Sequence, residues 1–198
     1  MLSDDVMNPA SGEMKLTAKI FFITSWLPTG FLNTTGIYPN KLVWKHFNIT
    51  LAAMIRINFP KDKVITRQRS GINEIFDGIR KKWLVLTPEE WVRQNFIQFI
   101  LIEKKYPGSL IAVEKEIRLG ELKKRCDIVV YNKESKPWMI IECKEMNVVL
   151  SAKTLDQILR YHIALPASYL IITNGNYCIG FKKEKDQFFE IDLFPEFE

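Results

Sequence analysis

Two short apolar runs separated by a polar turn constrain the fold of this chain more than any other feature. The runs are "CDIVVY" (126–131) and "WMIIECK" (138–144), with "NKESKP" between them. Apolar runs of this length around a short polar link are typical of an antiparallel hairpin of buried strands. A helical pattern at about 151–165 then leads into another apolar run, "SYLIIT". A strand reached through a crossover helix lies parallel in the same sheet, so we expect a mixed sheet.

A second helix is predicted from a strong N-terminal signal upstream of the hairpin. Thr87 is a natural N-cap, Pro88 occupies the first helical position, and Glu90 completes a T-x-x-E capping box. The apolar pattern that follows continues as far as the helix breakers Pro107 and Gly108.

The remaining segments complete an α/β fold with a mixed central sheet flanked by helices. A further helix is expected within 73–83, where apolar residues recur at helical spacing. Strands are expected at "SLIAVEKEIRL" and, as a terminal hairpin, at "YCIGF" and "FFEIDLF". The residues expected to face inward are Ile75, Phe76, Ile79 and Trp83 in the 73–83 helix, and Leu155, Ile158, Leu159 and Ile163 in the crossover helix.

The composition narrows the class of protein. The 198 residues suffice for one domain with a real core, and the net charge of +5 is compatible with a polyanionic partner. Cys126, Cys143 and Cys178 are odd in number and lack C-x-x-C spacing, which predicts buried free thiols and a cytoplasmic location. No apolar run reaches the roughly 18 residues of a membrane span, so no membrane association is expected.

The chain is expected to divide near residue 54 into an N-terminal extension and a compact domain. Residues 1–53 show no sustained periodicity and are interpreted as a poorly defined N-terminal extension. Residues 54–198, beginning at Met54, are expected to form the compact domain.

Each run of the predicted hairpin carries one acid. If the six-residue loop closes a hairpin without a bulge, Asp127 lies directly opposite Glu142, and like charges so placed repel. The pair is tolerable if one acid is protonated or if a divalent cation such as Mg²⁺ lies between them. Lys144, two residues after Glu142, projects from the same face. A structural ion pair between Glu142 and Lys144 is the simpler alternative.

Other candidates lie on the two helices. Gln157 and Tyr161 are four residues apart and share one face, where they could hold a phosphate or a metal-bound water, or lie at the rim of the core. Glu89, with Glu90 as its alternative, could reach the site, although acids near a helix N-terminus also stabilise the helix dipole. Glu114 is a weaker candidate that is expected to face solvent.

The pattern D-x14-E-x-K followed by Q-x3-Y resembles the PD-(D/E)XK nuclease superfamily. More narrowly, "IFDGIRKKWLVLTPEEWVRQNFI", "KRCDIVVY", "PWMIIECK" and "LIITNG" resemble the N-terminal nuclease domain of type I restriction enzyme R subunits, in its small stand-alone version. The resemblance covers roughly residues 54–181. It implies a restriction-endonuclease-like core and Mg²⁺-dependent cleavage of DNA, with Mn²⁺ as a substitute. The implied metal ligands are Asp127 and Glu142, and the other implied catalytic residues are Lys144, Gln157, Tyr161 and Glu89.

The sequence therefore predicts a Mg²⁺-dependent endodeoxyribonuclease. The alternative is a non-catalytic DNA-binding module of the same fold that acts with a partner; a homodimer is also possible. The ATPase motor of type I restriction subunits is not expected here, because no G-x-x-x-x-G-K-[ST] motif occurs in the 198 residues. Basic runs at 80–82, 123–125 and 182–185 could attract the DNA backbone.

Overall fold

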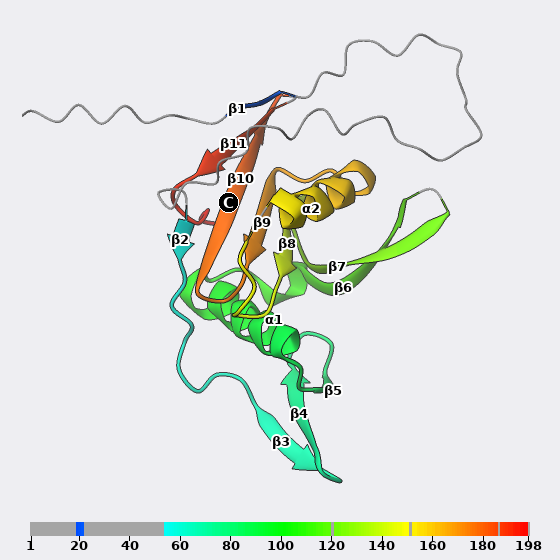
Figure 1. Cartoon of the computed structure of the whole chain (residues 1–198), viewed down its shortest axis with the longest axis vertical. Helices are drawn as coiled ribbons and strands as arrows, with labels where there is room; N and C mark the ends of the chain where they lie inside the picture. Colours follow the sequence, from blue (N-terminus) through cyan, green and yellow to red (C-terminus); the bar gives the residue numbers. More distant parts are fainter. Residues whose placement is uncertain (1–18, 22–53, 120, 151, 186, 198) are drawn as a thin grey trace, which may run out of the picture.

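The computed structural model describes residues 19–21, 54–119, 121–150, 152–185 and 187–197. The expected extension at 1–53 therefore lies outside the described residues, apart from 19–21. The described chain forms a large sheet and a small one (Figure 1). The large sheet has the order β1 (Lys19–Phe21), β11 (Gln187–Ile191), β10 (Tyr177–Glu184), β9 (Tyr169–Thr173), β8 (Pro137–Cys143), β7 (Leu122–Tyr131) and β6 (Ile111–Leu119), and β2 (Met54–Arg56) pairs with β10. The small sheet has the order β3 (Thr66–Arg69), β4 (Ile72–Asp77) and β5 (Lys82–Val85).

The large sheet is mixed, as the sequence predicts. β8 and β9 run parallel and are joined through α2 (Ala152–Ala164), whereas the other strand pairs of this sheet are antiparallel. The α/β class and the crossover connection are thus confirmed. Among the described residues, no helix is long and apolar enough to cross a membrane.

One helix packs on each face of this sheet. α1 (Pro88–Gln98), which continues as a π-helical turn over Phe99–Glu103, shares one core cluster with Ile128 and Ile141. α2 shares the other cluster with Val129 and Ile140. The alternation of successive strand residues between two clusters follows from the two-residue period of a strand buried on both faces. Of the residues expected to face inward on α2, Leu155, Ile158 and Leu159 are buried, but Ile163 is 70% exposed.

The register of the β7–β8 hairpin fixes the position of the two acids. Ile128 pairs with Ile141 and Val130 with Met139, which is the register expected from the loop length. The assumption of a bulge-free hairpin was wrong near the turn, where the register shifts between Val130 and Tyr131. The shift lies on the turn side, so it does not affect the other end of the hairpin. There Asp127 and Glu142 are the next residues beyond the last pair, Ile128–Ile141.

The helix expected within 73–83 is wrong; β4 and β5 form a hairpin there. Phe76 and Trp83 recur at helical spacing but are directly opposed across the two strands, with ring centroids 5.2 Å apart. The Asp77 carboxylate accepts the main-chain N–H groups of Ile79 (2.9 Å) and Arg80 (2.8 Å), and this local turn competes with helix formation. Lys81 completes the reversal with φ of 55°.

Aromatic residues near the end of the described chain hold α1 against the sheet. The Phe194 ring centroid lies 5.8 Å from that of Phe96 and 5.4 Å from that of Phe99. The Tyr106 hydroxyl donates to the main-chain carbonyl of Pro195 at 2.8 Å. The position of α1 therefore depends on residues distant in the sequence.

Candidate functional site

The N-terminus of α1 brings two acids to the edge of the sheet. The Thr87 hydroxyl accepts the main-chain N–H of Glu90 at 3.1 Å, which confirms the predicted N-cap. The reciprocal half of the capping box is wrong, because the Glu90 carboxylate instead pairs with Arg93 and accepts from the side-chain amide of Gln94 at 2.9 Å. Glu89 keeps 45% of its side chain exposed and is the freer of the two acids.

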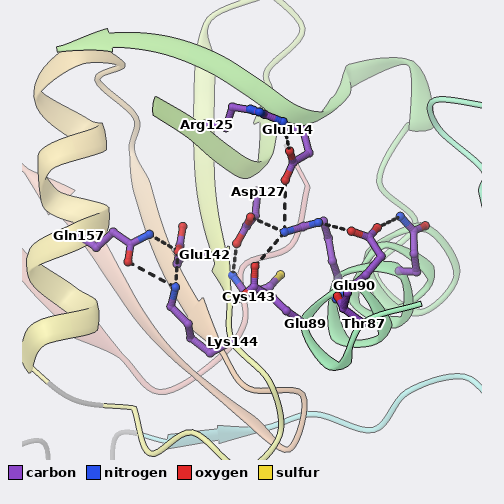
Figure 2. A network of polar contacts seen from close by, with 12 residues as sticks. Thr87, Glu89, Glu90, Glu114, Arg125, Asp127, Glu142, Cys143, Lys144 and Gln157 are labelled. Atoms are coloured by element: carbon purple, nitrogen blue, oxygen red, sulfur yellow. Dashed lines mark hydrogen bonds and ion pairs between the residues drawn. The ribbon is translucent and has the colours of Figure 1, made fainter. Parts of the chain in front are cut away.

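Asp127 lies next to Ile128–Ile141, the pair of β7 and β8 that is farthest from the turn. Its Oδ2 accepts the main-chain N–H of Cys143 at 2.7 Å. Beyond the pair Ile128–Ile141, this carboxylate therefore takes the place of a main-chain carbonyl as the acceptor for β8. Its Oδ1 accepts from the guanidinium of Arg93 at 2.7 Å. With only 6% of the residue exposed, this carboxylate is fixed by a strand amide on one side and by α1 on the other (Figure 2).

Glu142 lies at the centre of a second group of polar side chains. Its Oε1 accepts from Lys144 Nζ at 2.7 Å and from the side-chain amide of Gln157. The same amide nitrogen lies 2.9 Å from the Tyr161 hydroxyl, so the predicted shared face of Gln157 and Tyr161 is confirmed. Figure 2 shows Gln157 reaching from α2 toward Glu142 and Lys144.

Arg93 joins the acids of α1 to those of the sheet, and it was not among the site residues predicted from the sequence. Its guanidinium lies 2.7 Å from Asp127, 3.1 Å from Glu89 and 3.3 Å from Glu114, and it also pairs with Glu90. Its spacing of three and four residues from the two helix acids was the available signal, since such pairs meet on one helix face. The arginine is nevertheless buried and acts across the fold.

Glu114 is closer to the site than its alternating strand position suggested. Its side chain is 21% exposed, and it lies between Arg93 and the exposed Arg125, whose guanidinium donates to it at 3.0 Å. The expectation that Glu114 faces solvent was therefore wrong. The structure thus brings together residues from α1, β6, β7, β8, the segment directly after β8, and α2. They include all six candidates named from the sequence: Glu89, Asp127, Glu142, Lys144, Gln157 and Tyr161.

Comparison with known proteins identifies the relationship. The family "Type I restriction enzyme R protein N terminus (HSDR_N)" matches residues 88–195, which is more than half of the chain. The chain belongs to this family. Membership implies a nuclease-like domain that interacts with DNA. No curated protein and no solved structure matches the chain.

The family match contains the whole polar site and begins one residue after the N-cap of α1. The small sheet, at 66–85, lies outside it. The matched region thus starts where the helix that carries Glu89 and Arg93 begins.

The electrostatics of this restriction-enzyme domain favour a bound cation. Burial, followed by the nearby Asp127 charge, raises the pKa of Glu142 to about 8. Burial also raises the pKa of Asp127, although Arg93 and the Cys143 amide oppose the shift. Burial alone would lower the pKa of Lys144, but its hydrogen bond to Glu142 and the nearby negative charges, first that of Glu142, together outweigh burial and raise the pKa. Two buried acids that resist ionisation form a site where added positive charge is stabilising.

The donor set fits a hard divalent ion that keeps part of its hydration shell. Oε2 of Glu142 is buried and has no hydrogen-bond partner among the described residues, so one carboxylate oxygen is available as a ligand. In the part of the chain that the structure describes, no group of three or more His, Cys, Asp or Glu residues is arranged to hold a metal. Mg²⁺ is commonly bound by one or two carboxylates together with water and substrate phosphate, so Asp127 and Glu142 are the residues that could hold such an ion.

The raised pKa of Glu142 predicts a pH-dependent cost to stability. Without metal, folded Glu142 keeps its proton up to pH of about 8, whereas the unfolded chain releases it near the ordinary value of 4.5. The folded state therefore binds more protons between these values, and its stability falls as pH rises through this window. Glu142→Gln removes that fall, so its free energy of unfolding relative to wild type should improve by about 2 kcal/mol from pH 6 to pH 9.

Urea denaturation in the presence of a chelator measures this effect. Glu134→Gln, on the exposed β7–β8 turn, is the matched control and should give no such trend. A constant difference between Glu142→Gln and wild type across this pH range would contradict the prediction.

Proposed function

We propose that this protein is a Mg²⁺-dependent endonuclease with a restriction-endonuclease-like core that hydrolyses phosphodiester bonds of DNA. The observation that carries the proposal is the convergence of Asp127, Glu142 and Lys144 at the end of the β7–β8 ladder. Two oxygen ligands beside a cationic side chain are what metal-assisted attack on a phosphodiester requires. Family membership supports the same reaction.

The side chains have separable roles in this reaction. Asp127 and Glu142 would hold Mg²⁺, which when bound polarises the phosphodiester and lowers the pKa of a coordinated water. Lys144 supplies a positive charge for the negative charge that develops on the phosphoryl oxygens, or holds the attacking water. Gln157 lies 3.3 Å from Lys144 Nζ and also donates to Glu142, so it positions both groups.

Two further residues border the reacting groups. Tyr161 is held by Gln157, and burial together with Glu142 raises the pKa of its hydroxyl to about 12. The hydroxyl therefore stays protonated at neutral pH and can donate a hydrogen bond to a phosphate. Glu89, half-exposed at the start of α1, is the acid best placed to orient water at the open side of the site.

Supercoiled plasmid DNA tests the proposal directly. The purified protein should convert supercoiled plasmid to the nicked form with Mg²⁺ or Mn²⁺, and the conversion should stop when a chelator is added. Direct appearance of linear plasmid would indicate two cooperating sites, as in a homodimer. Persistent failure to nick with either ion would overturn the proposal.

A second candidate, a DNA-binding module without catalysis, is favoured by one observation. Both acids already have cationic partners in the protein, since Arg93 pairs with Asp127 and Lys144 pairs with Glu142. Such internal neutralisation would suffice for a purely structural site. Metal-independent DNA binding without nicking is the outcome that would support this candidate.

A further inference from the structure

A basic arm extends from the large sheet beside α1. We define the basic arm as residues 61–85, which comprise β3, β4, β5 and the segment before them. In Figure 1 its strands stand away from the large sheet, on the far side of α1. One face of the arm packs on α1, where Ile75 and Asp77 of β4 are both fully buried. The arm is thus anchored to the helix that contributes Glu89 and Arg93 to the site.

The arm carries most of the net positive charge of the protein. Residues 61–82 contain seven Lys or Arg and three Asp or Glu, a net charge of +4 out of the chain's +5. Two of these acids are paired within the arm, Glu74 with Arg67 at 2.6 Å and Asp77 with Arg80 at 2.5 Å. Five of its basic residues are exposed and form no ion pair with any described residue: Lys61, Lys63, Arg69, Lys81 and Lys82.

The exposed charges are spread along the length of the arm. Arg69 lies at the tip between β3 and β4, and Lys81 lies in the turn at the opposite end of β4. The six residues of β4 span about 20 Å at about 3.3 Å per residue. That length corresponds to about six nucleotides of one strand at 3.4 Å each. The spacing therefore suits contact with several successive phosphates.

The inner end of the arm adjoins the acidic site. Arg80, next to Lys81, places its guanidinium 3.7 Å from the carboxylate of Glu90 on α1. β5 leads directly to Thr87, the N-cap of the same helix. A nucleic-acid backbone lying along the arm is therefore directed toward Glu89 and the metal-binding acids.

The aromatic residues of the arm favour backbone contact over base stacking. The Arg67 guanidinium lies over the Trp83 ring, 4.0 Å from its centroid, and Phe76 packs against the same ring. Binding of single strands commonly uses aromatic faces that are free to stack on bases. Because Arg67 and Phe76 already contact the Trp83 ring, the chemistry that the arm offers is mainly that of charges facing phosphates.

We propose that the basic arm binds the sugar–phosphate backbone of duplex DNA and guides it to the site at Asp127 and Glu142. This inference rests on the proposed function and assigns a substrate-binding surface to it. The assignment is independent of the family match, which begins after the arm. Binding of this kind depends little on sequence and strongly on salt, because each contacted phosphate releases counterions.

Salt-dependent DNA binding tests the role of the arm. Arg69→Gln/Lys81→Gln removes one charge at each end of β4, and Lys133→Gln/Lys136→Gln, on the exposed β7–β8 turn, removes the same charge elsewhere. Fluorescence anisotropy follows a labelled duplex of about 30 base pairs over a range of KCl concentrations, with a chelator present to prevent cleavage. The slope of log K against log salt should fall by about two for the arm variant, with about a tenfold or greater loss of affinity at 0.1 M salt. The turn variant should bind like wild type, and thermal unfolding verifies that both variants fold.

The outcomes separate this inference from the proposed function. If the arm variant keeps the wild-type salt slope and affinity while the wild-type protein nicks plasmid, DNA binding by the arm is overturned and the proposed nuclease activity stands. An arm-dependent slope in a protein that never nicks would support the arm and overturn the nuclease. Tighter binding to the matching single strand would overturn duplex DNA as the occupant. The same conclusion would follow if the arm variant lost affinity only for polyglutamate, an acidic polypeptide. A wild-type protein that binds no DNA would overturn both proposals.

Discussion

Lys144→Gln lowers the rate of metal-dependent plasmid nicking by about a hundredfold or more, while Mn²⁺ still binds. Lys144 contributes positive charge beside Glu142 rather than a metal ligand, and donors aimed at developing charge are typically worth factors of 10² to 10³. Its side chain is 20% exposed, so glutamine fits without filling a buried space. Isothermal titration calorimetry with Mn²⁺ and plasmid nicking under the same conditions measure the two effects separately.

Two companion variants make this prediction specific. Asp127→Asn removes a proposed ligand, so it should weaken Mn²⁺ binding as well as nicking. Lys136→Gln, in the exposed turn between β7 and β8, should alter neither. If Lys144→Gln nicks plasmid at more than a tenth of the wild-type rate, Lys144 is not a participant in the chemistry.

Arg93→Leu lowers the free energy of unfolding of the metal-free protein by about 3–5 kcal/mol, because it leaves two buried acids, Asp127 and Glu90, without the cation that pairs with both. Burial alone would lower the pKa of Arg93, but Asp127 and Glu90 outweigh it and raise the pKa above its ordinary range. The arginine is therefore held charged by the acids that it neutralises. Urea denaturation with a chelator present measures the loss.

Metal should partly reverse this loss. A divalent ion at Asp127 supplies positive charge that the variant lacks, so saturating Mn²⁺ should stabilise Arg93→Leu more than wild type. Arg160→Leu on α2 is the matched control, since Arg160 also pairs with an acid four residues earlier but is 67% exposed. The control should lose less than about 1 kcal/mol. Equal losses at the two positions would show that the acids around Arg93 need no cation.

The main sheet was predictable because its signals are local. The predicted register of β7 and β8 holds from Val130–Met139 to Ile128–Ile141 because the irregularity is confined to the turn side, and a helix between two apolar runs required a parallel crossover. The 73–83 segment was not predictable in the same way, because Phe76 and Trp83 are equally spaced for a helix and for opposition in a hairpin. The side-chain turn at Asp77 decided between the two structures.

The site was predictable where its residues share a hairpin or a helix. The pairs Asp127–Glu142 and Gln157–Tyr161 follow from strand register and from four-residue helical spacing, respectively. Arg93 was not predictable because its main partner lies 34 residues away, and only the packing of α1 on the sheet brings the two together. The same packing decides that Glu114 faces the site rather than solvent.

The dependence of α1 on Phe194 has a consequence for biosynthesis. Domains emerge from the ribosome N-terminal end first, and Phe194 is made almost a hundred residues after the Phe96 ring that it covers. The side of α1 that Phe194 covers therefore stays uncovered until every described strand of the sheet has been translated, since β11 ends at Ile191. The aromatic packing that holds α1, the helix of Glu89 and Arg93, against the sheet is therefore completed only after residue 194 has been translated.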